Sequence, residues 1–112
     1  MRGVVPFLRV RDAEAAAEWY ARLGFEVEWR HRFEPHLPLF ASIRRADLDW
    51  RIFLSEHAGD ARPGALLYLY ADDVDTIAAE FEVAAQEAPY GAREVELVDP
   101  DGNRLRIGVL HA

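Results

Sequence analysis

The sequence predicts an α+β fold of two βαβββ modules, with curved mixed sheets that form a cleft. Three observations carry this prediction. Segments in which hydrophobic and polar residues alternate, as they do in half-buried strands, recur in both halves of the chain. Each half also has one segment with the hydrophobic spacing of a helix, and an acidic residue precedes it. The pattern restarts after a polar segment near the midpoint, so the chain contains an internal repeat of roughly sixty residues.

The first module begins with a strand and a helix. Asp12 is expected to cap a helix that extends through Leu23, and Gly24 follows where a left-handed residue often ends a helix. The apolar residues of this helix recur at three- and four-residue spacing, which gives it one face that packs on a sheet. Pro35 and Pro38 predict a loop after the second strand. Strands are predicted at residues 3–10, 25–31, 39–44 and 48–55.

The second module repeats this order after a linker at residues 58–64. An acidic residue, Asp72 or Asp73, is expected to cap its helix. Pro100 and Gly102 predict a tight turn between the last two strands, because proline pre-sets φ and glycine allows the positive φ of a reversal. Strands are predicted at residues 65–71, 92–98 and 104–110, and the modules of this single domain span about 1–57 and 65–112.

The helix of a βαβββ unit covers one face of its sheet and leaves the other bare, so two such units can enclose a cavity. The alternative is two unrelated α+β halves. Because side chains alternate along a strand, strand parity identifies those that face the cleft. The cleft side chains expected by this rule are Val5, Phe7, Arg9, Arg51, Phe53, Ser55, Leu66, Tyr68, Tyr70, Arg104, Arg106 and Gly108.

Composition narrows the class of protein. The net charge of −7 disfavours a nucleic-acid partner and suits a cationic ligand, although an acidic surface also serves solubility alone. The chain has no cysteine, which excludes disulfides, thiolate ligands and a thiol nucleophile. No segment resembles an export signal or reaches membrane-spanning length, so we expect a cytoplasmic protein without a membrane partner.

Residues 89–103 read Pro-Tyr-Gly-Ala-Arg-Glu-Val-Glu-Leu-Val-Asp-Pro-Asp-Gly-Asn. They resemble the Pro-Trp-Gly-x-Arg-Glu-Phe…Asp-Pro-Asp-Gly-Asn signature of the glyoxalase, bleomycin-resistance and extradiol-dioxygenase superfamily, also called vicinal oxygen chelate proteins. Tyr90 stands where Trp is usual and Val95 where Phe is usual. Residues 6–12 and 19–25 also look like the first strand and helix of that family, so the resemblance covers nearly the whole chain and implies the same two-module fold.

The resemblance also bears on metal binding. In metal-dependent relatives His or Glu side chains on four strands hold the metal, and the matching positions here are Val5, Phe53, Leu66 and Arg106. Three of these side chains are apolar and the fourth is a cation without a lone pair to donate. The chain therefore resembles the metal-free branch, best known for proteins that sequester bleomycin, a cationic glycopeptide antibiotic, and we expect no cofactor.

Several aromatic and charged side chains are candidates for ligand contact. Tyrosine rings offer stacking surfaces for heteroaromatic groups and attract cations, although each ring alone is more often part of a core. Glu94 and Glu96 either line the cleft or form cross-strand ion pairs with Arg104 and Arg106. The predicted ligand-binding residues are Trp29, Phe33, Phe53, Tyr68, Tyr70, Tyr90, Glu94 and Arg106.

The leading hypothesis is a homodimeric protein that binds a cationic aromatic antibiotic of the bleomycin type at two sites on the subunit interface. One alternative is a lyase, isomerase or dioxygenase of this fold, or a metal-free enzyme that uses Glu94 or His31 as a general base. Another is the binding of a different metabolite or a peptide. His31, Glu34 and His36 lie near a loop and lack the spacing that would bring their side chains together on a metal.

Overall fold

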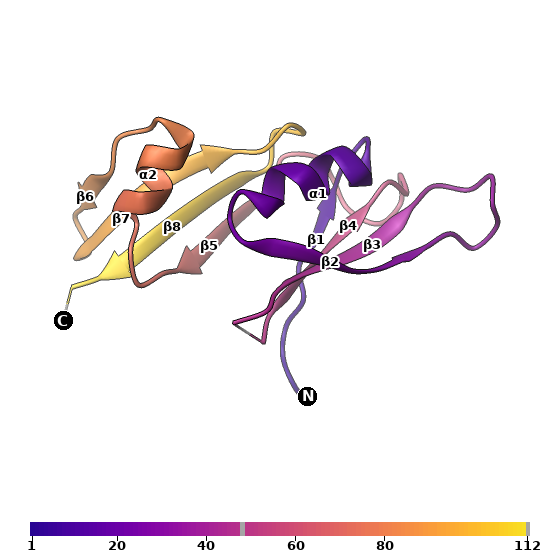
Figure 1. Ribbon diagram of the computed structural model, residues 1–112, viewed down its shortest axis with the longest axis horizontal. Helices are drawn as coiled ribbons and strands as arrows, with labels where there is room; N and C mark the ends of the chain where they lie inside the picture. Colours follow the sequence, from indigo (N-terminus) through magenta and orange to yellow (C-terminus); the bar gives the residue numbers. More distant parts are fainter. Residues whose placement is uncertain (48, 112) are drawn as a thin grey trace. The chain divides into compact units, whose positions relative to one another are not determined.

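The computed structural model describes residues 1–47 and 49–111. The chain divides into two compact units. The first unit comprises Met1–Ala65 with Pro100–Asn103, and the second comprises Leu66–Asp99 with Arg104–Ala112. Each unit carries one four-stranded mixed sheet and one helix (Figure 1), which confirms the predicted α+β class. No helix within the described residues is long and apolar enough to cross a membrane.

The sheet of the first unit has the strand order β1-β4-β3-β2, in which β1 pairs with β4 in parallel and the other pairs are antiparallel. Helix α1 covers one face of this sheet (Figure 1), and its Tyr20 is fully buried together with Leu8, Ile43 and Leu54 from the strands. The other sheet face is left without a helix of its own unit. The elements are β1 (Phe7–Arg9), α1 (Ala13–Ala21), β2 (Phe25–His31), β3 (Phe40–Arg45) and β4 (Arg51–Ser55).

The second unit repeats this topology. Its sheet has the order β5-β8-β7-β6, with β5 parallel to β8 and the remaining pairs antiparallel. Val74 next to α2 and Val95, Leu105 and Ile107 of the sheet are buried, and they form the core beneath the helix. The elements are β5 (Leu66–Tyr70), α2 (Asp75–Phe81), β6 (Gln86–Ala88), β7 (Ala92–Val98) and β8 (Arg104–Leu110).

Three strands, at residues 25–31, 92–98 and 104–110, have the bounds that alternation predicts. The predicted first strand is too long, because Pro6 has no N–H to donate and only its carbonyl joins the ladder, by accepting from Phe53 N at 3.0 Å. Helix α1 ends at Ala21, two residues before the prediction, although Asp12 does cap it by accepting from Ala15 N at 3.1 Å.

The fourth strand begins at Arg51 rather than at Leu48, which lies outside the described residues. Asp73 is not the N-cap of α2, a position that Val74 occupies. Its carboxylate instead accepts from Asp75 N at 2.8 Å, which is one of the free backbone donors at the start of the helix, and from the Thr76 hydroxyl Oγ1 at 2.6 Å. Strand β3 begins and ends one residue later than the strand predicted at 39–44. Strand β5 is one residue shorter at each end than the strand predicted at 65–71.

Pro100–Asn103 of the Asp-Pro-Asp-Gly-Asn turn belong to the first unit, although Asp99 and the flanking strands belong to the second. Asn103 is fully buried; its Nδ2 donates to Arg9 O at 3.1 Å, and its Oδ1 accepts from Ala65 N at 3.0 Å. Asp101 Oδ1 accepts from the backbone N of Arg11 at 2.9 Å. Gly102 has φ +82°, which explains why a glycine stands there. The signature residues therefore fasten the turn to the first unit.

Replacing Glu56 by alanine is expected to destabilise the protein by about 1–3 kcal/mol, because two backbone donors lose a carboxylate acceptor. Glu56 Oε2 accepts from Ala13 N at 2.8 Å, at the start of α1, and Oε1 accepts from Leu39 N at 2.9 Å, just before β3. Urea unfolding measures the change. Glu18→Ala, at an exposed site on α1, is the control and should cost less than about 0.5 kcal/mol. Equal effects of the two variants would contradict this role.

Candidate functional site

Each unit exposes aromatic side chains on the sheet face that its own helix leaves open. In the first unit Phe7, Trp29, Phe40 and Phe53 form one cluster with ring centroids 5.2 to 5.5 Å apart. Phe7 and Trp29 remain 39% exposed, so this cluster is a surface and not a sealed core. The parity rule placed Phe7 and Phe53 on this face correctly, whereas Ser55 is fully buried and its hydroxyl donates to Asp60 Oδ2 at 2.6 Å.

The open face of the second unit combines aromatic and charged side chains. Leu66, Tyr68 and Tyr70 of β5 are all exposed, as strand parity predicts. The ring centroids of Tyr68 and Tyr70 lie 5.5 Å apart, and the two ring planes make an angle of 64°. Strands β8 and β7 add Arg106 opposite Glu96, and Glu94 opposite Gly108. This face therefore brings aromatic and charged site residues of the prediction together on one sheet.

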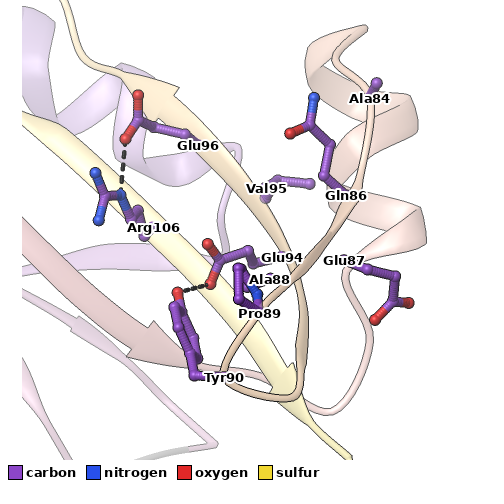
Figure 2. Close-up of a pocket in the computed structure, with 10 residues that line it drawn as sticks. All are labelled: Ala84, Gln86, Glu87, Ala88, Pro89, Tyr90, Glu94, Val95, Glu96 and Arg106. Atoms are coloured by element: carbon purple, nitrogen blue, oxygen red, sulfur yellow. Dashed lines mark hydrogen bonds and ion pairs between the residues drawn. The ribbon is translucent and has the colours of Figure 1, made fainter.

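Two tyrosines converge on one carboxylate oxygen. Tyr68 Oη donates to Glu94 Oε2 at 2.8 Å, and the hydroxyl of Tyr90 donates to the same oxygen. Figure 2 shows Tyr90 reaching Glu94 from the turn before β7. Of the alternatives left open for the two glutamates, the cross-strand ion pair is found for Glu96, which accepts from Arg106 Nε at 2.9 Å, whereas Glu94 lies opposite a glycine.

Both phenols are held in their protonated form. Burial is the largest cause that raises the pKa of Tyr68, and its hydrogen bond to Glu94 raises it further. For Tyr90 the hydrogen bond to Glu94 is the largest cause of a raised pKa, followed by loss of solvent. A negative charge beside a phenol disfavours phenolate, so both hydroxyls act as donors at neutral pH.

Gly108 makes this arrangement possible. A Cβ atom at Gly108 would lie 2.0 Å from Tyr68 Oη and 2.9 Å from its Cζ, so the ring crosses the space that any side chain there would fill. The sequence placed Gly108 on the open face but did not reveal this role. A glycine inside a strand is the available signal, since it often marks a close approach.

A pocket of about 480 Å3 adjoins the Tyr90 and Glu94 side chains in the second unit. The segment from Ala84 to Tyr90 forms one wall, and side chains of β7 and β8 form the other (Figure 2). Part of this wall is β6, a strand that alternation did not predict because Gln86–Ala88 is short and pairs only with β7. The volume lies within the range of small-molecule sites.

The remaining predicted site residues lie in the first unit. Trp29 and Phe53 belong to the aromatic cluster, and their centroids are 5.4 Å apart. Phe33 is 64% exposed and contacts the rings of His31 and His57 instead. It shares with Trp29 a shallow apolar pocket of about 390 Å3. Ligand contact by each of these residues stays a prediction.

The residues at the metal positions of the family do not fit a metal ion. Val5, Phe53 and Leu66 have no donor atoms, and the guanidinium of Arg106 is a cation whose pKa its hydrogen bond to Glu96 raises further. Among the described residues there is also no group of three or more His, Asp or Glu side chains placed to hold a metal, so the His31 region provides no such site.

Replacing Glu94 by glutamine should lower the pKa of both Tyr68 and Tyr90, because the negative charge that disfavours phenolate is removed. The fall should be larger for Tyr90, since burial still acts on Tyr68. NMR of 13Cζ-labelled tyrosine measures each titration. Because folding raises both tyrosine pKa values, the two phenols stabilise the folded protein at pH values below about 10, the ordinary tyrosine pKa. This stabilisation is lost as the pH rises through the pKa values of the folded protein. Unchanged titration in Glu94→Gln, as expected for the control Glu87→Gln, would contradict the arrangement.

Comparison with known proteins identifies the family. The family model described as "Glyoxalase superfamily protein" matches residues 1–110. No curated protein sequence matches the chain significantly. The structure resembles that of a bleomycin-binding protein solved in complex with bleomycin. The match covers 99% of this chain and all of the other chain, with a TM-score of 0.76 and 22% identity.

Two further solved structures are similar. The bleomycin resistance determinant encoded on transposon Tn5 has a TM-score of 0.78 and 22% identity, with both chains covered completely. TnmS3, an antibiotic-binding protein from Streptomyces sp. CB03234, has a TM-score of 0.79 and 24% identity over 99% of each chain. The family match and the shared fold together define a protein of the glyoxalase and bleomycin-resistance fold, and this chain belongs to the glyoxalase superfamily.

Proposed function

We propose that this protein binds and sequesters a cationic aromatic antibiotic of the bleomycin type, without a metal of its own and without modifying the antibiotic. The observation that carries this proposal is the open face of the second unit, where Tyr68 and Tyr90 surround the carboxylate of Glu94. The rings provide stacking surfaces, and the carboxylate provides a negative charge for a cation. The antibiotic and bleomycin ligands of the structural neighbours support the same class of ligand.

The side chains at the family metal positions support binding rather than metal-assisted chemistry. A lyase or dioxygenase of this superfamily that works through a metal needs donor side chains where this chain has Val5, Phe53, Leu66 and Arg106. On the open face, Arg106 and Glu96 are paired with each other. The face is therefore built of hydrogen-bonded and ion-paired groups that present a fixed surface to a ligand.

We further propose that the working protein is a homodimer. Each unit exposes large apolar side chains on its open face, including Phe7 and Trp29 in the first and Leu66 and Tyr70 in the second. Such surfaces commonly mark binding or subunit contacts. Light scattering should give about twice the chain mass of 12.8 kDa at micromolar concentration. A ligand-binding monomer would contradict the dimeric site.

Calorimetric titration with metal-free and copper-loaded bleomycin tests the function. We expect saturable binding with a dissociation constant of about 1 μM or below for at least one form. Tryptophan fluorescence in a parallel titration reports on the first unit as a whole, because all three tryptophans lie there. Tyr70→Ala should weaken binding by about 1–3 kcal/mol, while Val83→Ala, outside this face, should not. No saturable binding below about 1 mM would overturn the proposal.

A further inference from the structure

Three carboxylates line the pocket of the second unit, and cations of the protein already neutralise two of them. Glu96 is 2.9 Å from Arg106 Nε and 3.7 Å from a guanidinium nitrogen of Arg104. Glu87 is 3.8 Å from Arg93 and also contacts His111. In Figure 2 the Glu87 carboxylate is directed away from Tyr90 and the Glu94 carboxylate. Neither Glu96 nor Glu87 therefore offers an uncompensated charge to a ligand.

Glu94 differs from both. Its hydrogen-bond partners are two phenol groups, which are neutral, and both donate to Oε2. Within residues 1–47 and 49–111 no ion pair of Glu94 with an arginine or histidine is found, and Oε1 accepts no hydrogen bond. The charge of Glu94 does act on nearby Arg106, but the guanidinium is hydrogen-bonded to Glu96, which is the largest cause of its raised pKa. Among the described residues, Glu94 thus offers an acceptor oxygen without a hydrogen-bond donor at a half-buried place, where charge interactions are stronger than in bulk water.

The surroundings of Glu94 also restrict which chemical groups can bind. The hydroxyls of Tyr68 and Tyr90 are both committed to Glu94, so they cannot donate to an anion or a carbonyl of a ligand. A quaternary ammonium would be attracted by the charge and the ring faces but has no N–H to donate to Oε1. A protonated amine or a guanidinium satisfies both the charge and the acceptor, and makes a charge-assisted hydrogen bond.

We propose that Glu94 Oε1 and the adjoining pocket form a subsite for one N–H-donating cationic group, a primary ammonium or guanidinium, attached to a planar ring. Tyr68 and Tyr90 act as positioning residues, because their hydroxyls fix the carboxylate and leave Oε1 turned to the ligand. This subsite deepens the proposed function and rests on it, since it assigns the cationic part of the ligand to one atom of the protein.

The test uses three simple probes that share a benzyl group: benzylammonium, benzyltrimethylammonium and benzyl alcohol. Their binding is followed by NMR shifts of the full chain at neutral pH. Benzylammonium should shift the resonances of Tyr68, Tyr90 and Glu94, and it should bind at least about tenfold more tightly than either other probe, as a charge-assisted hydrogen bond implies. Comparable affinity for all three probes, or shifts elsewhere, would overturn the subsite.

Two matched variants locate the charge. Glu94→Gln keeps the size of the side chain and should abolish the preference for benzylammonium, whereas Glu87→Gln, another pocket carboxylate, should keep it within about threefold because its charge is already compensated. A preference that survives Glu94→Gln would overturn the assignment. The probe comparison in the wild-type protein decides the question even if a variant folds poorly.

Failure of this subsite and failure of the proposed function give different results. If bleomycin does not bind but benzylammonium prefers Glu94, the subsite stands and the antibiotic assignment is wrong. If bleomycin binds and the three probes bind alike, the proposed function stands and the subsite is wrong.

Discussion

Replacing Asn103 by alanine is expected to lower the free energy of unfolding by about 2–4 kcal/mol, the largest stability effect of the substitutions considered. The amide of Asn103 is fully buried and joins Arg9 O to Ala65 N, two backbone groups far apart in sequence. Alanine removes both hydrogen bonds and leaves these groups without their partner. Urea unfolding monitored by tryptophan fluorescence reports the loss directly, since all three tryptophans lie in the first unit.

Gln86→Ala is the matched control for Asn103, because it removes an amide side chain from an exposed position on β6. Its effect should stay within about 0.5 kcal/mol. If Asn103→Ala were as mild as this control, the turn would not be fastened by its asparagine, and the structural reason for the Asp-Pro-Asp-Gly-Asn sequence would be wrong.

Replacing Gly108 by alanine is expected to weaken ligand binding while leaving the fold intact. The new Cβ would collide with the ring of Tyr68, which is 38% exposed and can turn away into solvent. The hydrogen bond between Tyr68 and Glu94 would then be lost, together with the stacking surface of the ring. We expect bleomycin binding to weaken by about 1–3 kcal/mol and the free energy of unfolding to change by less than about 1 kcal/mol.

Gly59→Ala controls for the loss of a glycine, because nothing lies within 4 Å of a Cβ atom at that position. It should leave bleomycin affinity unchanged. Calorimetry gives the affinities, and the resonance of the Tyr68 ring shows whether the ring has moved. Unaltered binding by Gly108→Ala with a displaced Tyr68 would mean that this tyrosine takes no part in the site.

Alternation of hydrophobic residues predicted the strands that have one face in the core. It succeeded for residues 92–98 and 104–110, because each of these strands has a clear buried face. It also gave the bounds of residues 25–31, although only Phe25 of that strand is buried and the one buried face expected there is wrong. It failed for β6, whose three residues are exposed or half-buried and carry no such pattern. It also predicted that β1 begins before Pro6, since hydrophobic periodicity takes no account of the N–H group that proline lacks.

For the candidate site, the sequence led us to propose the residues but not how they meet. Tyr68, Tyr90 and Glu94 could be proposed from strand parity and from the family signature. Their convergence on one carboxylate oxygen depends on the parallel register of β5 and β8, which pairs Tyr70 with Gly108 and places the Tyr68 ring across that glycine. Register between strands far apart in sequence is set by packing, so no local pattern reveals it.

Chemical-shift mapping with metal-free bleomycin tests the central claim most directly. Backbone amide spectra of the 15N-labelled protein would be recorded up to saturation with the antibiotic. Binding at the open face of the second unit predicts the largest shifts on β5, β7 and β8, around Tyr68, Glu94 and Arg106, with small shifts on α2. Shifts confined to α2 or to the covered side of the sheet, or no shifts at saturating bleomycin, would contradict the proposed binding site.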